Sequence, residues 1–202
     1  RRVLFRSDRF YLCNIGIDIN EVLKAPELKL KGKSLVFTGV MDYEPNEDAM
    51  VYFIQEVFDK VAKKCPEVTL YIVGKNPTDK LKKLVKNRKN IIVTGKVDSV
   101  FSYIKSSTIY ISPLRIGSGK KNKIIEAISC GTPLVASTVS MEGFEDIEDK
   151  NLILRADSSN EWVENICKLL SDEEKRIDIK KRMLNLLDES YSWKNIAKKL
   201  VE

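Results

Sequence analysis

Hydrophobic runs alternate with helical patterns along most of the chain. From Ser34 onward, short runs rich in β-branched and aromatic residues are separated by segments whose apolar residues recur at helical spacing. The runs read SLVFTG, VTLYIVG, NIIVTG, TIYISPL and TPLVAS. This alternation predicts an α/β fold in which crossover helices connect the strands of a parallel sheet.

The first helical segment has the clearest apolar stripe. Asn46 is the expected N-cap, and Glu47 and Asp48 follow it, where their charges complement the helix dipole. The predicted buried face consists of Met50, Phe53, Ile54, Val57, Phe58 and Val61.

The two ends of the chain depart from this alternation. The first seventeen residues predict one short strand and a turn, and residues 20–33, with Pro26 and Gly32, resemble a linker. After a predicted edge strand at Asn151–Arg155, the pattern becomes entirely helical. The expected helices are Ser158–Leu170, Asp172–Leu187 and Trp193–Val201.

Glycines end three of the predicted strands, at Gly39, Gly74 and Gly95. The carboxyl edge of an open α/β sheet is where ligands bind, so these glycines are candidates for a binding site. They are equally compatible with tight turns that have no other role.

A glycine-rich loop, Arg115–Gly119, precedes a helix in the segment SPLRIGSGKKNKIIEAISC. The unpaired amide groups and the dipole at a helix N-terminus favour a phosphate. Nearby cations add positive charge, while three isoleucines of the helix are expected to face the sheet. The cations are Arg115, Lys120, Lys121 and Lys123, and the isoleucines are Ile124, Ile125 and Ile128.

Glu126 lies one helical turn beyond Asn122 on the same face. A carboxylate does not help to bind phosphate, and its natural partners are hydroxyl donors such as a ribose diol. The loop matches neither the P-loop nor the GxGxxG fingerprint, because Lys121 and Asn122 occupy decisive positions. A surface loop with a salt bridge to Glu126 is the structural alternative.

Composition excludes several classes of chemistry. The 202 residues include no histidine, and the four cysteines are scattered without a CxxC pair, which argues against zinc sites and His-based catalysis. Such cysteines are typical of reduced, buried thiols in a cytosolic protein. The net charge of +6 is spread over many lysines and only weakly favours anionic partners. No apolar segment is long enough to span a membrane.

These motifs resemble the C-terminal, donor-binding half of GT-B glycosyltransferases of retaining family 4. The resemblance covers most of the chain, from about Asn14 onward. The matching segments are NIGID, FTGVMDYEPNEDA, LYIVGKNP, the long block from IIVTGKVDS to GTPLVAS, the MEG turn and YSWKNIAKKL. The patterns GxMdyxPN and PLRxGSGxxNKxxEA are similar to a subgroup found in exopolysaccharide and lipopolysaccharide gene clusters. The fold implied is a Rossmann-like doubly wound parallel sheet with C-terminal helices.

The resemblance also implies roles for individual residues. Glu126 would bind the nucleotide ribose, the turn at Lys96 and Val97 the base, and Gly39 would approach the diphosphate. The loop at Ser118–Lys121 would hold the donor sugar. The full set of expected donor-binding residues is Gly39, Lys96, Val97, Gly117, Ser118, Gly119, Lys120, Lys121, Asn122 and Glu126.

Two departures from the family pattern affect the expected chemistry. Ser118 replaces the first glutamate of a family pair, and the acidic segment MDYEPNED replaces an Arg and a Lys that bind the diphosphate in many relatives. Arg115 and Lys123 are therefore the candidate catalytic cations. They would stabilise the departing diphosphate during transfer of a sugar, with retention, to an acceptor hydroxyl, and no metal is required.

The resemblance predicts three parts of the chain: residues 1–33 as an N-terminal remnant and linker, 34–190 as the donor-binding domain, and 191–202 as a crossover helix. An acceptor-binding N-terminal domain is expected to precede the chain, which alone would have little or no activity. The expected setting is cytoplasmic, with a sugar or lipid-linked saccharide as acceptor and peripheral contact of the whole enzyme with the membrane left open. No nucleic-acid partner is expected.

Three alternatives remain. A non-hydrolysing epimerase on the same architecture is disfavoured by the absence of histidine. A basic module for polyanions or membrane surfaces would use the helix Lys80–Lys89, which is more simply a solvated face. A nucleotide-binding regulatory or degenerate domain without catalysis is kept open by Ser118.

Overall fold

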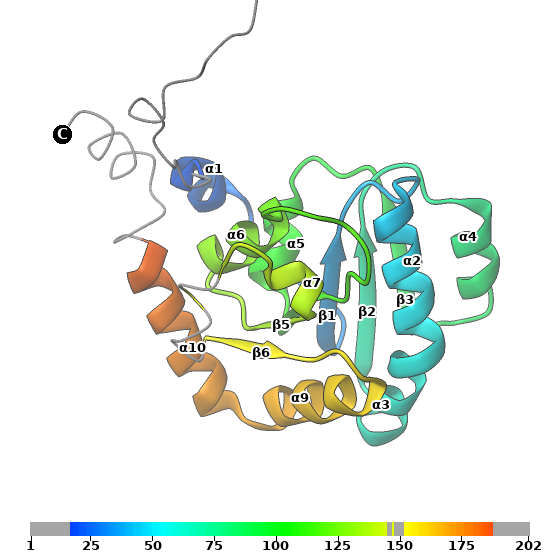
Figure 1. The fold of residues 1–202 in the computed structure, drawn as a ribbon. Coiled ribbons are helices and arrows are strands. Elements are labelled where there is room, and N and C mark those ends of the chain that lie inside the picture. The colour runs from blue at the N-terminus through cyan, green and yellow to red at the C-terminus, as the bar shows by residue number, and fades with distance from the viewer. Residues whose placement is uncertain (1–16, 145–146, 148–151, 188–202) are drawn as a thin grey trace, which may run out of the picture.

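A parallel sheet forms the centre of the molecule (Figure 1). The computed structural model describes residues 17–144, 147 and 152–187. Within them the sheet has the strand order β3-β2-β1-β4-β5-β6, and every neighbouring pair is parallel. This is the strand order of a Rossmann-type sheet, so the predicted α/β fold is confirmed. The strands are β1 (Lys33–Thr38), β2 (Val68–Val73), β3 (Ile91–Gly95), β4 (Ile109–Ser112), β5 (Leu134–Ala136) and β6 (Ile153–Arg155).

Helices cover both faces of the sheet. The first long helical segment, which comprises α2 (Glu44–Tyr52), the π-helical turn η2 (Phe53–Phe58) and α3 (Asp59–Lys64), shares one face with α9 (Ser159–Ser171), and α4 (Asp79–Val85) adjoins α2. The other face carries α5 (Val100–Ser106) and α6 (Asn122–Ser129). The remaining helices are α1 (Ile19–Lys24), α7 (Thr138–Met141) and α10 (Glu173–Leu186).

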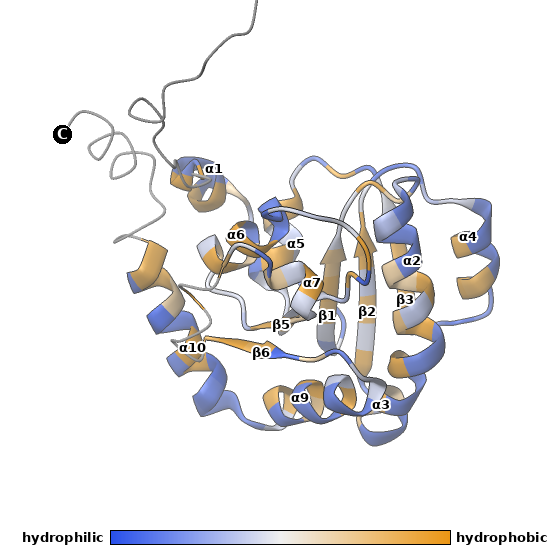
Figure 2. Cartoon of the chain, viewed as in Figure 1, coloured by the Kyte–Doolittle hydropathy of each residue, from blue (hydrophilic) through white to orange (hydrophobic). Residues whose placement is uncertain are grey.

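The core lies between the sheet and its two helical layers. All six residues of β2 are buried, as expected for a parallel strand covered on both faces, and Figure 2 shows its hydrophobic character. The predicted stripe of the first helix packs here: Phe53 is fully buried and meets the ring of Trp162 from α9 edge-on, with 5.7 Å between centroids. Burial of these large aromatic side chains is a main contribution to the stability of this layer.

The start of the first helix differs from the prediction. The helix begins at Glu44 with Tyr43 as N-cap, so Asn46 lies inside the first turn rather than capping it. Pro45 explains the difference, because its fixed φ and missing N–H suit the first helical positions and allow the helix to begin earlier. The Asn46 side chain is thereby released from capping and turned inward, where it is 7% exposed.

Residues 20–33 are not simply a linker. They include most of α1, whose N-cap Asp18 accepts a hydrogen bond from the Asn20 amide at 2.9 Å. Val22 and Ala25 are buried against the domain, which explains why this segment is ordered locally despite its many lysines. The basic helix predicted at Lys80–Lys89 is also shorter than expected, since α4 ends at Val85.

The helical C-terminal part follows the sequence pattern closely. Ser158 and Glu161 form a capping box at the start of α9, and Asp172 caps α10. The predicted edge strand is present as β6. Among the described cysteines, Cys65, Cys130 and Cys167 are free thiols.

Three predictions fall outside the described residues. They concern Cys13, the helix Trp193–Val201 and the strand expected in the first seventeen residues, of which only residue 17 is described. The division into 1–33, 34–190 and 191–202 stays a prediction.

Candidate functional site

Two adjoining pockets lie at the carboxyl edge of the sheet. The first has a volume of about 370 Å³ and the second about 270 Å³, and both are lined by Thr38, Gly39 and Glu126. Thr38 ends β1 and Gly39 follows it, and the neighbours of β1, β2 and β4, are reached by connections on opposite faces of the sheet. This is the topological switch point, where open α/β sheets bind their ligands. We call the two pockets together the cleft.

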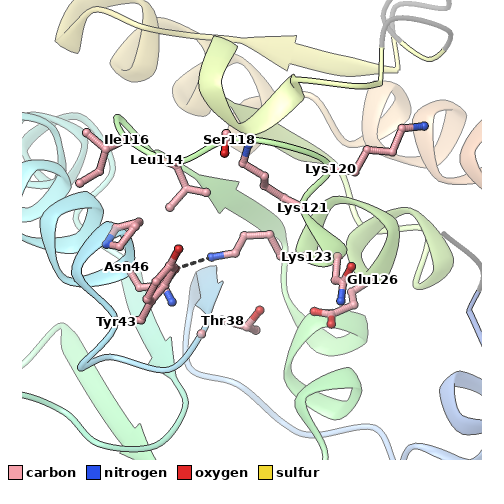
Figure 3. Close-up of a pocket in the computed structure, with 14 residues that line it drawn as sticks. Thr38, Tyr43, Asn46, Leu114, Ile116, Ser118, Lys120, Lys121, Lys123 and Glu126 are labelled. Carbon is pink, nitrogen blue, oxygen red and sulfur yellow. Dashed lines mark hydrogen bonds between the residues drawn. The ribbon is translucent and has the colours of Figure 1, made fainter. Parts of the chain in front are cut away.

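The first pocket brings together the segment after β1, the glycine-rich loop after β4 and the start of α6 (Figure 3). Of the predicted donor-binding residues, it contains Gly39, Gly117, Ser118, Lys120, Lys121, Asn122 and Glu126, as well as the predicted catalytic Lys123. Gly119 belongs to the same loop without lining the pocket.

The second pocket has a largely apolar wall. Predicted Lys96 and Val97 line it, at the end of β3, together with Val73 and Val100. Gly74 reaches this edge with φ +145°, and a Cβ there would lie within 2 Å of the Gly39 carbonyl oxygen. Glycine is therefore required at this position for the ends of β1 and β2 to approach each other. Gly74 also lines the second pocket, so the structural role and the candidate binding role coincide there.

The glycine-rich loop is held in place by its own lysine. Lys121, whose side chain is 8% exposed, places Nζ 3.1 Å from a carboxylate oxygen of Glu142 and 2.5 Å from the Gly119 carbonyl oxygen, to which it donates. Gly117 and Gly119 have φ values of +119° and +73°, which favour glycine. The MEG turn therefore braces the loop through Glu142.

Lys123 points into the first pocket from the first turn of α6 (Figure 3). Its Nζ donates to Asn46 Oδ1 at 2.7 Å and lies 4.2 Å from the centroid of the Phe37 ring. Burial lowers the pKa of Lys123 to about 7, although the nearby Glu126 carboxylate acts in the opposite direction. The ammonium is thus held inside the cleft at a high desolvation cost.

Glu126 lies where the two pockets meet. Burial raises the pKa of its carboxyl group, and the charge of Lys123 partly offsets that shift. Within the described part of the chain, no side chain forms a hydrogen bond or ion pair of 4 Å or less with this carboxylate. The alternative of a surface loop closed by a salt bridge to Glu126 is therefore wrong for this structure.

Arg115, the other predicted catalytic cation, lines neither pocket of the cleft. Its guanidinium forms a two-point ion pair with Asp48, at 2.9 and 2.5 Å, and lies 4.8 Å from the centroid of the Tyr52 ring. The acidic segment after β1 supplies Asp48 and so draws the guanidinium onto α2. Lys123 remains as the predicted catalytic cation that the structure places in the first pocket.

Several cleft residues were not anticipated from the sequence. Asn46 is the most important of these, because it was interpreted as a helix cap and instead contacts Lys123. Asn46 is the Asn of Pro-Asn in the subgroup pattern GxMdyxPN, and this match is the signal that could have identified it. The other unanticipated residues of the first pocket are Thr38, Tyr43, Pro45, Leu114 and Ile116.

Comparison with known families assigns the chain. Residues 32–172 match the family Glycosyl transferases group 1, which covers more than half of the chain and both pockets. This chain belongs to that family. As a group 1 domain, it has the Rossmann-like α/β fold of GT-B glycosyltransferases.

Three similar proteins illustrate the relationship. An uncharacterized glycosyltransferase of Methanocaldococcus jannaschii is 33% identical over 140 residues, or 65% of this chain and 35% of that protein. Phosphatidyl-myo-inositol mannosyltransferase of Mycobacterium tuberculosis is 29% identical over 128 residues, or 60% of this chain and 33% of that protein. The crystal structure of S. aureus TarM in complex with UDP aligns with a TM-score of 0.77 at 19% identity and covers 98% of this chain and 40% of TarM.

The group 1 domain spans about a third of the length of these two curated relatives. In the described residues, every helix is too short or too polar to cross a bilayer.

Proposed function

We propose that the cleft binds a nucleotide diphosphate sugar as the donor of a sugar transfer reaction. The observation that carries this proposal is the position of Glu126, an unpaired carboxylate between a largely apolar pocket and a pocket lined by Lys123. A nucleoside diphosphate presents a planar base whose aromatic faces suit an apolar wall, then a ribose diol, and then an anion. The TarM structure that this chain resembles was solved with UDP.

Each part of the cleft then has a distinct task. The wall at Lys96 and Val97 receives the base, and Glu126 accepts hydrogen bonds from the ribose hydroxyls. Lys123 and the amide groups at the start of α6 bind the diphosphate. The loop around Ser118 holds the sugar.

In the reaction itself, the bond between the anomeric carbon and the diphosphate oxygen breaks while the acceptor oxygen bonds to that carbon, with retained configuration. The proton of the acceptor hydroxyl passes to the departing diphosphate. Lys123 stabilises the negative charge that develops on the departing diphosphate. We propose that Lys123 and the helix N-terminus perform this role without a metal ion.

The acceptor and setting belong to the whole protein. The name of one relative, a phosphatidyl-myo-inositol mannosyltransferase, supports a lipid-linked acceptor. We further propose a cytoplasmic setting and a role in cell-surface polysaccharide synthesis. We expect the group 1 domain alone to bind the donor and to transfer little or no sugar, because we propose that the contacts to the acceptor lie outside the cleft.

Calorimetric titration of the chain with UDP, GDP and ADP tests the proposal. One nucleotide should bind saturably, and Glu126→Ala should weaken its binding by about tenfold or more because the ribose loses a charged hydrogen-bond partner. Glu164→Ala, which removes an exposed carboxylate on α9, is the matched control and should bind normally. Absence of binding to all three nucleotides would contradict the proposed function.

A second function is favoured by one observation. Ser118 lines the first pocket where many relatives have a glutamate that contacts the sugar. A domain that binds the nucleotide without catalysis would bind UDP and UDP-glucose equally, because no residue would recognise the sugar. A donor domain should bind the nucleotide sugar with an additional, Ser118-dependent contribution.

A further inference from the structure

Asn46 connects the segment after β1 to the cation of the cleft. It lies in the first turn of α2, lines the first pocket, and is 7% exposed. Its Nδ2 donates to the Val40 carbonyl oxygen at 3.0 Å, and its Oδ1 accepts from Lys123 Nζ at 2.7 Å (Figure 3). These two bonds fix the amide orientation, because only its NH₂ end can face a carbonyl and only its oxygen can face an ammonium.

The backbone beneath this amide leaves it little freedom. A Cβ on Gly39 would lie 2.7 Å from Asn46 Nδ2 and 2.8 Å from its Cγ, so the amide packs directly on the Gly39 backbone. Gly39 in turn lines both pockets. The acceptor for Lys123 is therefore anchored to the turn that the diphosphate is proposed to approach.

The neutrality of the amide is important for the charge of the cleft. Asn46 Oδ1 accepts a hydrogen bond without cancelling the positive charge, whereas a carboxylate in its place would form a closed ion pair. The Phe37 ring, 4.2 Å from Nζ, also attracts the cation without neutralising it. An ammonium has three N–H donors, and within the described residues one of them is used, by Asn46.

We propose that Asn46 is a positioning residue that holds the Lys123 ammonium in the cleft with its charge available to the donor diphosphate. This inference rests on the proposed function of the cleft and adds to it a residue of α2 that acts through Lys123. The proposal also explains how a segment rich in acidic residues contributes to an anion site. Asp48 pairs with Arg115 outside the two pockets, and Asn46 orients Lys123 inside the first one.

The competing explanation is that Asn46 only stabilises the turn through its bond to Val40. The two roles separate in a double-mutant cycle, because a turn defect weakens binding whether or not Lys123 is present. Asn46→Leu removes both hydrogen bonds at similar size. Lys123→Met removes the ammonium and keeps an unbranched side chain.

The test first titrates the full parent chain with UDP, GDP and ADP by heteronuclear NMR, which reaches millimolar dissociation constants. It then measures the affinity of every variant for the nucleotide that binds, taken below as UDP. The proteins are the parent, Asn46→Leu, Lys123→Met and the double variant, each checked for a native spectrum. Asn46→Asp is added because it keeps an acceptor and introduces charge. Asn160→Asp, at an exposed site on α9, makes the same chemical change far from the cleft and is the control.

We expect Asn46→Leu to weaken UDP binding by about tenfold in the parent and by less than about twofold in the Lys123→Met background, as for a lost hydrogen bond to a charged group. Asn46→Asp should weaken binding at least as much, while Asn160→Asp should leave it unchanged.

Equal losses in both backgrounds, or normal binding by Asn46→Asp, would overturn the positioning role while the proposed function stands. If the parent binds none of UDP, GDP and ADP, the proposed function fails and this inference fails with it.

Discussion

The clearest quantitative prediction concerns the pH dependence of donor binding. The pKa of Lys123 is lowered to about 7 by burial, with Glu126 raising it and Lys121 lowering it further, while its contacts Asn46 and Phe37 are neutral. A diphosphate binds the ammonium and not the amine. Raising the pH through 7 therefore removes the binding-competent form of the free domain.

The magnitude follows from the protonated fraction. With a pKa of about 7, that fraction is roughly 0.9 at pH 6 and roughly 0.1 at pH 8, and the apparent dissociation constant increases inversely, about tenfold. The bound diphosphate raises the pKa of Lys123, so the domain should take up close to one proton on binding at pH 8. The effect ends at high pH, once the lysine of the complex also deprotonates.

Calorimetry between pH 6 and 8, in buffers of different ionisation enthalpy, measures both quantities. The ligand is the glucose derivative of whichever nucleotide binds, for example UDP-glucose. The free nucleotide is unsuitable because its terminal phosphate would itself titrate near pH 6. Lys123→Met should bind weakly and independently of pH, and Lys123→Arg should remove the pH dependence while keeping the charge. A parent protein with pH-independent affinity and no proton uptake would refute the assigned role of Lys123.

Four further outcomes are expected. Lys123→Met should raise the melting temperature at pH 7 by several degrees, because charging the buried amine of the parent costs a few kcal/mol of stability. The difference in melting temperature between variant and parent should shrink as the pH rises from about 7 toward 10. Equal melting temperatures at pH 7 would contradict a destabilising Lys123. UDP should bind about tenfold more tightly than 2′-deoxy-UDP, and Glu126→Ala should abolish the difference; a difference that persists would place the ribose elsewhere. Arg115→Ala should change UDP affinity by less than about twofold, because the guanidinium is paired with Asp48; a tenfold loss in titration would return Arg115 to the site. Cys130, which is buried and has its pKa raised to about 12, should resist alkylation at pH 8, and mass spectrometry of rapidly labelled native protein would detect the contrary result.

The sheet could be predicted from the sequence because its signals are local. Each buried parallel strand is a short apolar run, and each crossover helix has its own stripe, so alternation alone gives the fold class. The residue at which a helix begins is predicted less well by the sequence. Asn46 is a good N-cap by type, yet Pro45 beside it begins the helix earlier, and α1 escaped prediction because six residues give too weak a pattern.

From spacing along the chain, the candidate site was predictable only where one segment carries it, whereas the family resemblance placed Gly39, Lys96 and Val97, which do line the cleft. The loop and Glu126 lie together in the sequence, so their shared face on α6 could be inferred. The partners of the cations come from distant segments: Arg115 pairs with Asp48, and Lys123 bonds to Asn46. Which partner each cation contacts depends on how α2 packs beside the loop after β4. Spacing along the chain does not predict these contacts.

The partners of the cations also explain how a cleft beside an acidic segment can favour an anion. Arg115 and Lys121 each have a carboxylate partner, whereas Lys123 bonds to an amide and faces an aromatic ring. A paired cation mainly organises the structure, since its field is largely cancelled at short range. A buried ammonium with neutral partners keeps its field, and it destabilises the empty domain for the same reason. If the cleft binds the donor as proposed, the diphosphate supplies the missing counter-charge, and the stability lost in the empty cleft is recovered as affinity for the donor.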